Sequence, residues 1–343
     1  MFSFTIQKVT MPLHIMKSKK LLFFLLLLSN AYGATATALK KSSLATTGID
    51  TTVIVPIGGI QQYLSFKGKD ITKPVLLFLH GGPGSSLMKV ADQFTQKLQD
   101  HFIVVQWDQR ETGATLALNA SPDKLTAELL QKDTEAMITY LLQHFNQKKL
   151  YLVSHSWGSV LAFDIAVKHP ELLYAYIPIS PIIDQQKGAA LTQTMLEKWA
   201  QKTKNETAIQ ELALVHIPFE KPDDLFYSQK WLFIHNGVDF AQKDDFKATY
   251  YKWLDIWFPM WKASVQGSLF TKVPEVHCPI YFFEGNGDKQ KSHDLVADYY
   301  RFLKAPKKKL FWFRKSGHTV FNTEPDKIQQ LLIETVLPET YIN

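Results

Sequence analysis

Residues 150–158, Leu-Tyr-Leu-Val-Ser-His-Ser-Trp-Gly, join an apolar run to a short turn of small residues. Leu150–Val153 is predicted to be a buried strand, and Gly158 begins a helical pattern. Ser156 lies between them, two residues after Ser154 and two before Gly158. This is the spacing of the G-x-S-x-G turn, with serine in place of the first glycine. The stretch predicts a nucleophile at Ser156, although a chance serine-rich turn is the alternative.

A second motif, His80–Gly84 (His-Gly-Gly-Pro-Gly), directly follows the apolar run Val75–Leu79. Glycines let a backbone approach a substrate oxygen closely. We expect the backbone N–H groups of Gly82 and Trp157 to form an oxyanion hole, which stabilises negative charge on a carbonyl oxygen. A plain Gly/Pro turn is the alternative. The position of the motif after one strand, with Ser156 after a later one, favours the oxyanion hole.

Apolar runs alternate with longer amphipathic stretches on both sides of these motifs. The expected strands are 51–56, 61–66, 75–79, 102–107, 150–153, 173–179, 279–283 and 309–313, and the expected helices are 86–100, 123–145, 158–168, 292–303 and 326–337. This alternation predicts an α/β fold, a mostly parallel sheet with helices on both faces. Between residues 185 and 272 helical stretches dominate. We therefore expect a core of residues 51–184 and 273–339 and an inserted helical lid of residues 185–272.

Three motifs in this order resemble those of one known group of enzymes. They are His80–Gly84, Trp107–Arg110 followed by Gly113, and Ser156–Ser159. Together they are similar to the proline iminopeptidase group of α/β-hydrolases, and the resemblance spans the expected core. It implies the α/β-hydrolase fold and a cis bond between Gly82 and Pro83, which is uncommon for X-Pro bonds in general. We interpret Asp108–Arg110 as a structural segment that ties loops together beside the site.

The other catalytic residues are expected from chain order, because in this fold the acid and then the histidine follow the nucleophile. Asp288 comes just after the seventh predicted strand, and His318 is the one histidine after the eighth. Both positions match the family pattern. Asp184, which follows the sixth predicted strand, is the alternative acid. Glu284 would still lie on its strand, and His293 begins a helix.

Ser156, His318 and Asp288 would act together as a catalytic triad. A serine hydroxyl needs a base, which neutral His318 supplies, while Asp288 fixes the tautomer and stabilises the imidazolium. An acyl-enzyme forms and water releases it. We expect a proline iminopeptidase-like serine hydrolase that cleaves amides or esters of small apolar acyl groups. The alternatives are a carboxylesterase without aminopeptidase activity and a non-catalytic binding protein of the same fold.

The expected lid carries aromatic residues at helical spacing. Tyr250, Trp253, Trp257 and Trp261 are three, four and four residues apart, so they share one helix face. They are expected to pack the lid onto the core. The functional alternative is that Trp253, Trp257 and Trp261 bind substrate as an apolar wall over Ser156. Both interpretations hold if the inner face of the lid is also the roof of the pocket.

A free amino group bound in a dry pocket needs a carboxylate partner. The resemblance implies lid glutamates, one of which follows a W-x-x-W pair, whereas here Trp253 and Trp257 are followed by Phe258. The lid acids that we considered are Glu197, Glu206, Glu211, Asp239 and Asp255, none of which is at that position. Asp255 is rotated about 200° from both tryptophans and should point to solvent. We therefore expect only a weak preference for a free amino terminus.

The N-terminus has the pattern of an export signal. Lys17, Lys19 and Lys20 precede the apolar run Leu21–Leu28, and the small residues Ala31 and Gly33 lie two apart, as a signal peptidase site requires. The run is shorter than the ~20 residues of a spanning helix. We expect a signal peptide over residues 1–33, a linker over 34–50, and a periplasmic or secreted protein without a stable membrane span. An uncleaved signal that anchors the chain is the alternative.

The charge and the cysteine content limit the classes of ligand and partner that we expect. The net charge is +6, from 38 basic and 32 acidic residues. Four of the lysines lie in residues 1–33, which contain no acid, so 34 basic and 32 acidic residues remain, a net charge of +2. We expect a small-molecule or short-peptide substrate and no nucleic-acid partner. Cys278, the single cysteine, is predicted to be a buried structural thiol. No cluster has metal-ligand spacing, so neither a metal nor another cofactor is expected.

Overall fold

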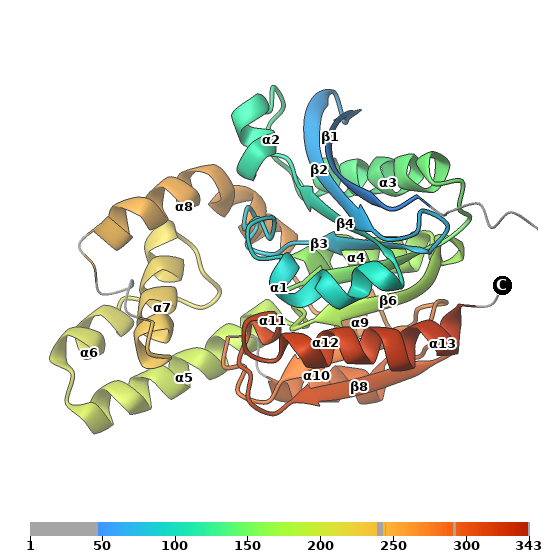
Figure 1. Cartoon of the computed structure of the whole chain (residues 1–343). Coiled ribbons are helices and arrows are strands. Elements are labelled where there is room, and N and C mark those ends of the chain that lie inside the picture. Colours follow the sequence, from blue (N-terminus) through green and yellow to red (C-terminus); the bar gives the residue numbers. More distant parts are fainter. Residues whose placement is uncertain (1–46, 239–242, 244, 291–292, 342–343) are drawn as a thin grey trace, which may run out of the picture. The chain divides into compact units, whose positions relative to one another are not determined.

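The strands form one eight-stranded sheet in the order β1-β2-β4-β3-β5-β6-β7-β8 (Figure 1). Their bounds are β1 Ile49–Ile57, β2 Ile60–Gly68, β3 Val75–Leu79, β4 Ile103–Asp108, β5 Leu150–His155, β6 Leu173–Ile179, β7 Ile280–Gly285 and β8 Lys308–Phe313. β2 pairs antiparallel with β1 and with β4. The pairings among β3 to β8 are parallel. The predicted α/β fold with a mostly parallel sheet is confirmed.

The structure is a computed structural model that describes residues 47–238, 243, 245–290 and 293–341. The predicted signal peptide, residues 1–33, and most of the predicted linker lie outside the described residues, so both stay predictions. Within the described ranges, no helix is both long enough and apolar enough to cross a membrane.

The helices agree with the predicted pattern in most places. Their bounds are α1 Asp92–Thr95, α2 Gly113–Leu118, α3 Ala127–His144, α4 Gly158–Lys168, α5 Gln185–Thr203, α6 Glu206–Leu212, α7 Pro222–His235, α8 Asp245–Ser264, α9 Leu269–Lys272, α10 His293–Phe302, α11 Val320–Thr323, α12 Pro325–Leu331 and α13 Leu337–Thr340. The helix expected over 86–100 is shorter, α1 plus the 3₁₀ turn Gln96–Asp100. Its first part instead forms a cavity wall, to which Ser86 and Leu87 contribute. A π-helical turn, Leu332–Val336, separates α12 from α13.

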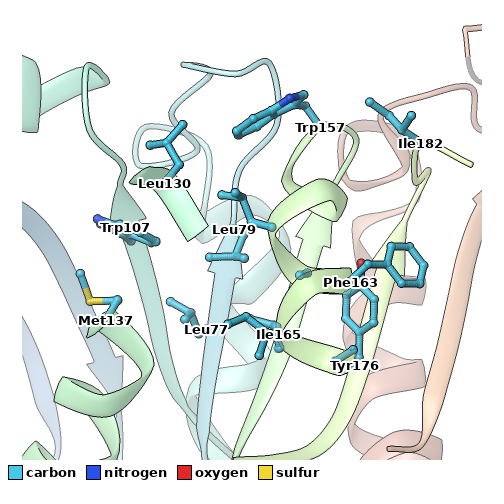
Figure 2. Packing of buried hydrophobic residues seen from close by; sticks show 14 of the residues in the cluster. Leu77, Leu79, Trp107, Leu130, Met137, Trp157, Phe163, Ile165, Tyr176 and Ile182 are labelled. Atoms are coloured by element: carbon cyan, nitrogen blue, oxygen red, sulfur yellow. The ribbon is translucent and has the colours of Figure 1, made fainter. Parts of the chain in front are cut away.

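Helices cover both faces of the sheet because successive strand residues point to opposite sides. On one face, Leu77 of β3 belongs to a buried cluster with Met137 of α3 and Ile165 of α4 (Figure 2). On the other, Phe78 packs edge-on against Phe94 of α1, with ring centroids 5.7 Å apart. Cys278, two residues before β7, is also buried, and burial raises the pKa of its thiol to about 12. The prediction of a buried thiol is confirmed.

Residues 185–272 contain helices α5 to α9 and, where the structure describes them, no strand. Two indole hydrogen bonds tie this lid to the core. Trp157 donates from Nε1 to Ser264 Oγ at 2.9 Å, and Trp253 donates from Nε1 to the carbonyl of Pro83 at 2.7 Å. The lid therefore contacts both the Ser156 turn and the His80–Gly84 loop.

Candidate active site

Ser156 lies at a strained turn between β5 and α4. Its φ is 51°, in the left-handed region that residues with a side chain rarely adopt. Serine at the first motif position is accommodated, because Ser154 is buried and its Oγ lies 2.8 Å from the hydroxyl of Tyr176. Gly158 has no room for a side chain, since a Cβ there would lie 2.7 Å from carbonyl oxygens at the end of β3. The tight turn predicted from the sequence is therefore present.

The His80–Gly84 loop lies directly against this turn. A Cβ on Gly81 would come within 2.8 Å of the carbonyl oxygen of His155, so the close approach requires glycine. The expected cis bond between Gly82 and Pro83 is confirmed. Gly82 lines the same cavity as Ser156. Within the described residues, neither the Gly82 N–H nor the Trp157 N–H is paired with a protein acceptor.

Buried polar contacts anchor the loop to the end of β4. His80 accepts a hydrogen bond at Nε2 from the Gln109 N–H at 3.2 Å, and its Nδ1 lies 3.0 Å from the carbonyl of Gly81. Burial lowers the pKa of His80, which fits a neutral ring with its proton on Nδ1. Arg110 is fully buried and bonds both oxygens of Asp133, at 2.8 and 3.0 Å. The interpretation of this segment as structural is confirmed.

Asp288 is the carboxylate that contacts His318. Its Oδ2 lies 2.8 Å from His318 Nδ1, its Oδ1 accepts the Gln290 N–H at 2.8 Å, and the residue is fully buried. Asp184, the alternative acid, instead caps α5 by accepting the backbone N–H of Lys187 at 2.9 Å. The contact between acid and histidine is thus made by the residue that chain order favoured.

In a catalytic triad, His318 is expected within hydrogen-bond reach of Ser156, at roughly 2.6–3.2 Å or farther apart without a ligand, and the two residues line the same cavity. His318 Nε2 is buried and has no hydrogen-bond partner among the described residues. A short Ser156–His318 hydrogen bond is therefore not present here, and the looser approach expected without a ligand stays a prediction. Catalytic hydrogen bonds are often long without substrate and shorten only in the reacting complex. The His318 ring borders the cavity and is held at Nδ1 by Asp288.

The cavity has a volume of about 660 Å³ and is lined by residues of both core and lid. Trp253 and Trp261 are on its wall, which agrees with the functional alternative, and their binding of substrate stays a prediction. Trp257, predicted with them, is not part of the lining. Its indole packs on Gly84, where a Cβ would lie 2.7 Å from Trp257 Nε1, so glycine makes the room that the ring occupies. In the part of the chain that the structure describes, no three His, Cys, Asp or Glu side chains are grouped to hold a metal ion.

His155 is a cavity residue that the sequence analysis did not single out. Its Nε2 donates to the carbonyl of His318 at 3.0 Å, and the two rings lie 4.9 Å apart. It therefore links the Ser156 turn to the loop after β8. Its place immediately before Ser156, the predicted nucleophile, is the signal that could have found it.

Asp245 is a lid acid that the sequence analysis missed. It lines the cavity together with Thr249 and Trp253, which follow it at intervals of four residues on α8. Residues at this spacing share a helix face, so counting back from the tryptophan would have found it. Asp255 is exposed, as expected. Of the other acids considered, Asp239 lies outside the described residues, and Glu197, Glu206 and Glu211 are not part of the lining.

Known proteins resemble this chain in sequence over the site and over most of the sheet. The family described as "alpha/beta hydrolase fold" matches residues 74–325. The chain is 29% identical over 296 residues to the Bacillus subtilis protein named "Probable aminopeptidase YbaC", covering 78% of this chain and 91% of that one. It is 33% identical over 126 residues to a proline iminopeptidase of Lactobacillus helveticus, covering 36% and 41% of the two chains.

A solved structure shares the fold. The proline iminopeptidase of Mycobacterium smegmatis aligns with a TM-score of 0.57 at 16% identity, over 84% of this chain and 99% of that chain. Because the family match spans most of the sheet and both loops of the site, this chain belongs to the α/β-hydrolase family, in its proline iminopeptidase-like group, and is a hydrolase.

Proposed function

We propose that this enzyme is a serine hydrolase that works through an acyl-enzyme on Ser156. The observation that carries the proposal is the setting of His318. Its Nδ1 contacts Asp288 at 2.8 Å, while its buried Nε2 has no partner among the described residues and the ring borders the cavity of Ser156. A histidine held at Nδ1 by a carboxylate keeps the tautomer that accepts a proton at Nε2.

In the proposed reaction, His318 takes the proton of the Ser156 hydroxyl as its oxygen attacks the substrate's carbonyl carbon. The N–H groups of Gly82 and Trp157 donate to the resulting oxyanion, each contributing about 3–4 kcal/mol to the transition state. Protonated His318 then gives its proton to the leaving amine or alcohol. Water, activated by the same histidine, releases the acyl group as an acid.

The cavity wall supports a substrate with a small apolar acyl group. Phe246, Tyr250, Trp253 and Trp261 supply aromatic surface from α8. Asp245 offers a carboxylate to a free amino group, which favours amides of small apolar amino acids as substrates. Esters of the same acyl groups would use the same machinery.

A carboxylesterase without aminopeptidase activity is the second candidate. Asp245 is exposed, so water screens its charge, and Lys243 lines the same cavity with the opposite charge. Both observations weaken recognition of an ammonium group and leave ester cleavage unaffected.

The test of the proposed mechanism is Ser156→Ala. We expect the variant to lose hydrolysis of an aryl ester by about 10,000-fold or more, together with covalent labelling by a fluorophosphonate. Ser86→Ala is the matched control, because this serine lies on the wall of the same cavity and should leave labelling intact. Mass spectrometry of the labelled wild-type peptide identifies the modified residue. Labelling of Ser156→Ala at the wild-type rate would refute the mechanism.

A further inference from the structure

Glu284 is a fully buried carboxyl near the end of β7, four residues before Asp288. It pairs in register with Trp312 of β8, and all six residues of β7 are buried. Within the described chain, neither of its side-chain oxygens receives a hydrogen bond from a protein donor. An ionised carboxyl is strongly disfavoured in such a place, because burial removes the water that would stabilise its charge.

The Asp288 N–H bonds the carbonyl of Gly285 at 3.0 Å, so the turn after β7 folds Asp288 back toward Glu284. Burial and the neighbouring charge of Asp288 raise the pKa of Glu284 well above its usual range. Asp288, in contrast, already accepts hydrogen bonds from the Gln290 N–H and from His318. These donors stabilise negative charge, so the proton of the pair belongs on Glu284 and the charge on Asp288.

The backbone that follows Glu284 packs tightly against the loop that carries His318. A Cβ on Gly285 would lie 2.0 Å from the carbonyl oxygen of Gly317, and the Gly287 N–H bonds the carbonyl of Ser316 at 2.9 Å. The loops that carry Asp288 and His318 are therefore in direct backbone contact beside Glu284.

We propose that Glu284, in its neutral form, is a positioning residue that donates a hydrogen bond to the Asp288 carboxylate and holds it on His318. This inference rests on the proposed function, which makes Asp288 and His318 part of the catalytic triad. A further donor makes Asp288 less basic, so the Nδ1 proton stays on the imidazole. Glu284 is not part of the cavity lining and acts only through Asp288.

Two substitutions separate the hydrogen bond from simple space filling. Glu284→Gln keeps a donor of nearly the same shape, whereas Glu284→Leu fills the site without one. We expect fluorophosphonate to label the Gln variant within about threefold of the wild-type rate, and the Leu variant at least about tenfold more slowly. Circular dichroism checks that both variants are folded.

The low-field proton resonance of His318 Nδ1–H, measured by NMR, gives a second readout. It should stay near its wild-type position in the Gln variant and move in the Leu variant, because only the latter deprives Asp288 of a donor. A residue that merely fills space would leave the resonance where it is in both variants.

The pH dependence of stability tests the protonation state of Glu284 without reference to catalysis. A carboxyl whose pKa is raised by folding contributes its full stability below its usual pKa and loses it as pH rises toward the folded value. Among the described residues, the charged groups that face Glu284 are Asp288 and, through it, His318, and both remain in Glu284→Gln. We expect the Tm of the Gln variant, relative to wild type, to increase as pH rises from about 5 to about 8.

The outcomes distinguish this inference from the proposed function. Wild-type labelling and an unmoved resonance in Glu284→Leu would overturn the positioning role while Ser156 remains the nucleophile. A pH-independent difference in Tm between Glu284→Gln and wild type would overturn the neutral state. If Ser156→Ala is still labelled, the proposed function fails, and the pH comparison still decides the state of Glu284.

Discussion

The sheet and the lid position their cavity residues by different means. In the core, Ser156, Asp288 and His318 follow strands β5, β7 and β8, whose pairing with parallel neighbours fixes where each loop begins. In the lid, Trp253 and Asp245 lie on one helix, α8, whose placement depends on side-chain contacts such as the indole bond to the His80–Gly84 loop. In the proposed reaction, the core carries the chemistry and the lid selects the substrate.

The largest effect that separates the two regions is expected from Asp288→Asn. The variant keeps the shape of the side chain but removes the charge that orients His318 and stabilises its protonated ring. We expect kcat/KM on an aryl ester to fall on the order of 10³–10⁴-fold. Steady-state kinetics with thermal unfolding as a folding check would measure this loss.

Asp184→Asn is the matched control for that experiment. Asp184 caps the first lid helix, and asparagine caps helices about as well as aspartate. The rate should therefore be nearly unchanged. If Asp184→Asn is the more damaging of the two substitutions, the acid has been assigned to the wrong loop.

A smaller effect is expected where the two regions meet. Ser264→Ala removes the acceptor of the buried Trp157 indole and leaves its N–H unpaired. We expect the free energy of unfolding, measured with urea, to fall by about 1–3 kcal/mol. Ser268→Ala is the control, because its buried Oγ has no hydrogen-bond partner among the described residues. Equal losses in the two variants would mean that the indole bond does not hold the lid.

The sequence was sufficient to predict the core because its signals are local. The strand Val75–Leu79 and the helix Gly158–Lys168 have the expected bounds, since apolar runs and small turn residues define their ends. The contact of Asp288 with His318 followed from chain order, because the carboxyl ends of parallel strands meet at one edge of a sheet. Whether Ser156 and His318 form a short hydrogen bond without substrate depends on angstrom-scale side-chain placement, which no sequence pattern encodes.

The lid was harder to predict, because helical spacing shows which residues share a helix face but does not show what each of them contacts. The tryptophans share a face, as expected, yet Trp257 rests on Gly84 while Trp253 and Trp261 reach the cavity. Asp245 was not predicted because the four-residue spacing that leads back from Trp253 was not applied to the acids at the start of α8. Glu284 was set aside because it lies on a strand, although its burial next to Asp288 is what makes it of interest.

The smallest expected effect concerns the lid's choice between an amide with a free amino group and its blocked form. Wild-type enzyme should cleave a prolyl arylamide no more than about fivefold faster than the N-acetyl form, because an exposed ion pair contributes at most about 1 kcal/mol. Asp245→Asn should reduce the ratio of the two rates to about one, because it removes the negative charge that attracts the amino group. Lys243→Gln should increase the ratio, because it removes a positive charge that repels that group. A short-chain aryl ester, which carries no amino group, should respond to neither substitution.

A preference of about a hundredfold for the free amine corresponds to about 2.7 kcal/mol, more than a solvated carboxylate provides. Such a result would mean that the lid closes over the substrate and excludes water from the carboxylate of Asp245. The lid would then bind the ammonium group by a desolvated contact, as the core holds His318 by its contact with buried Asp288.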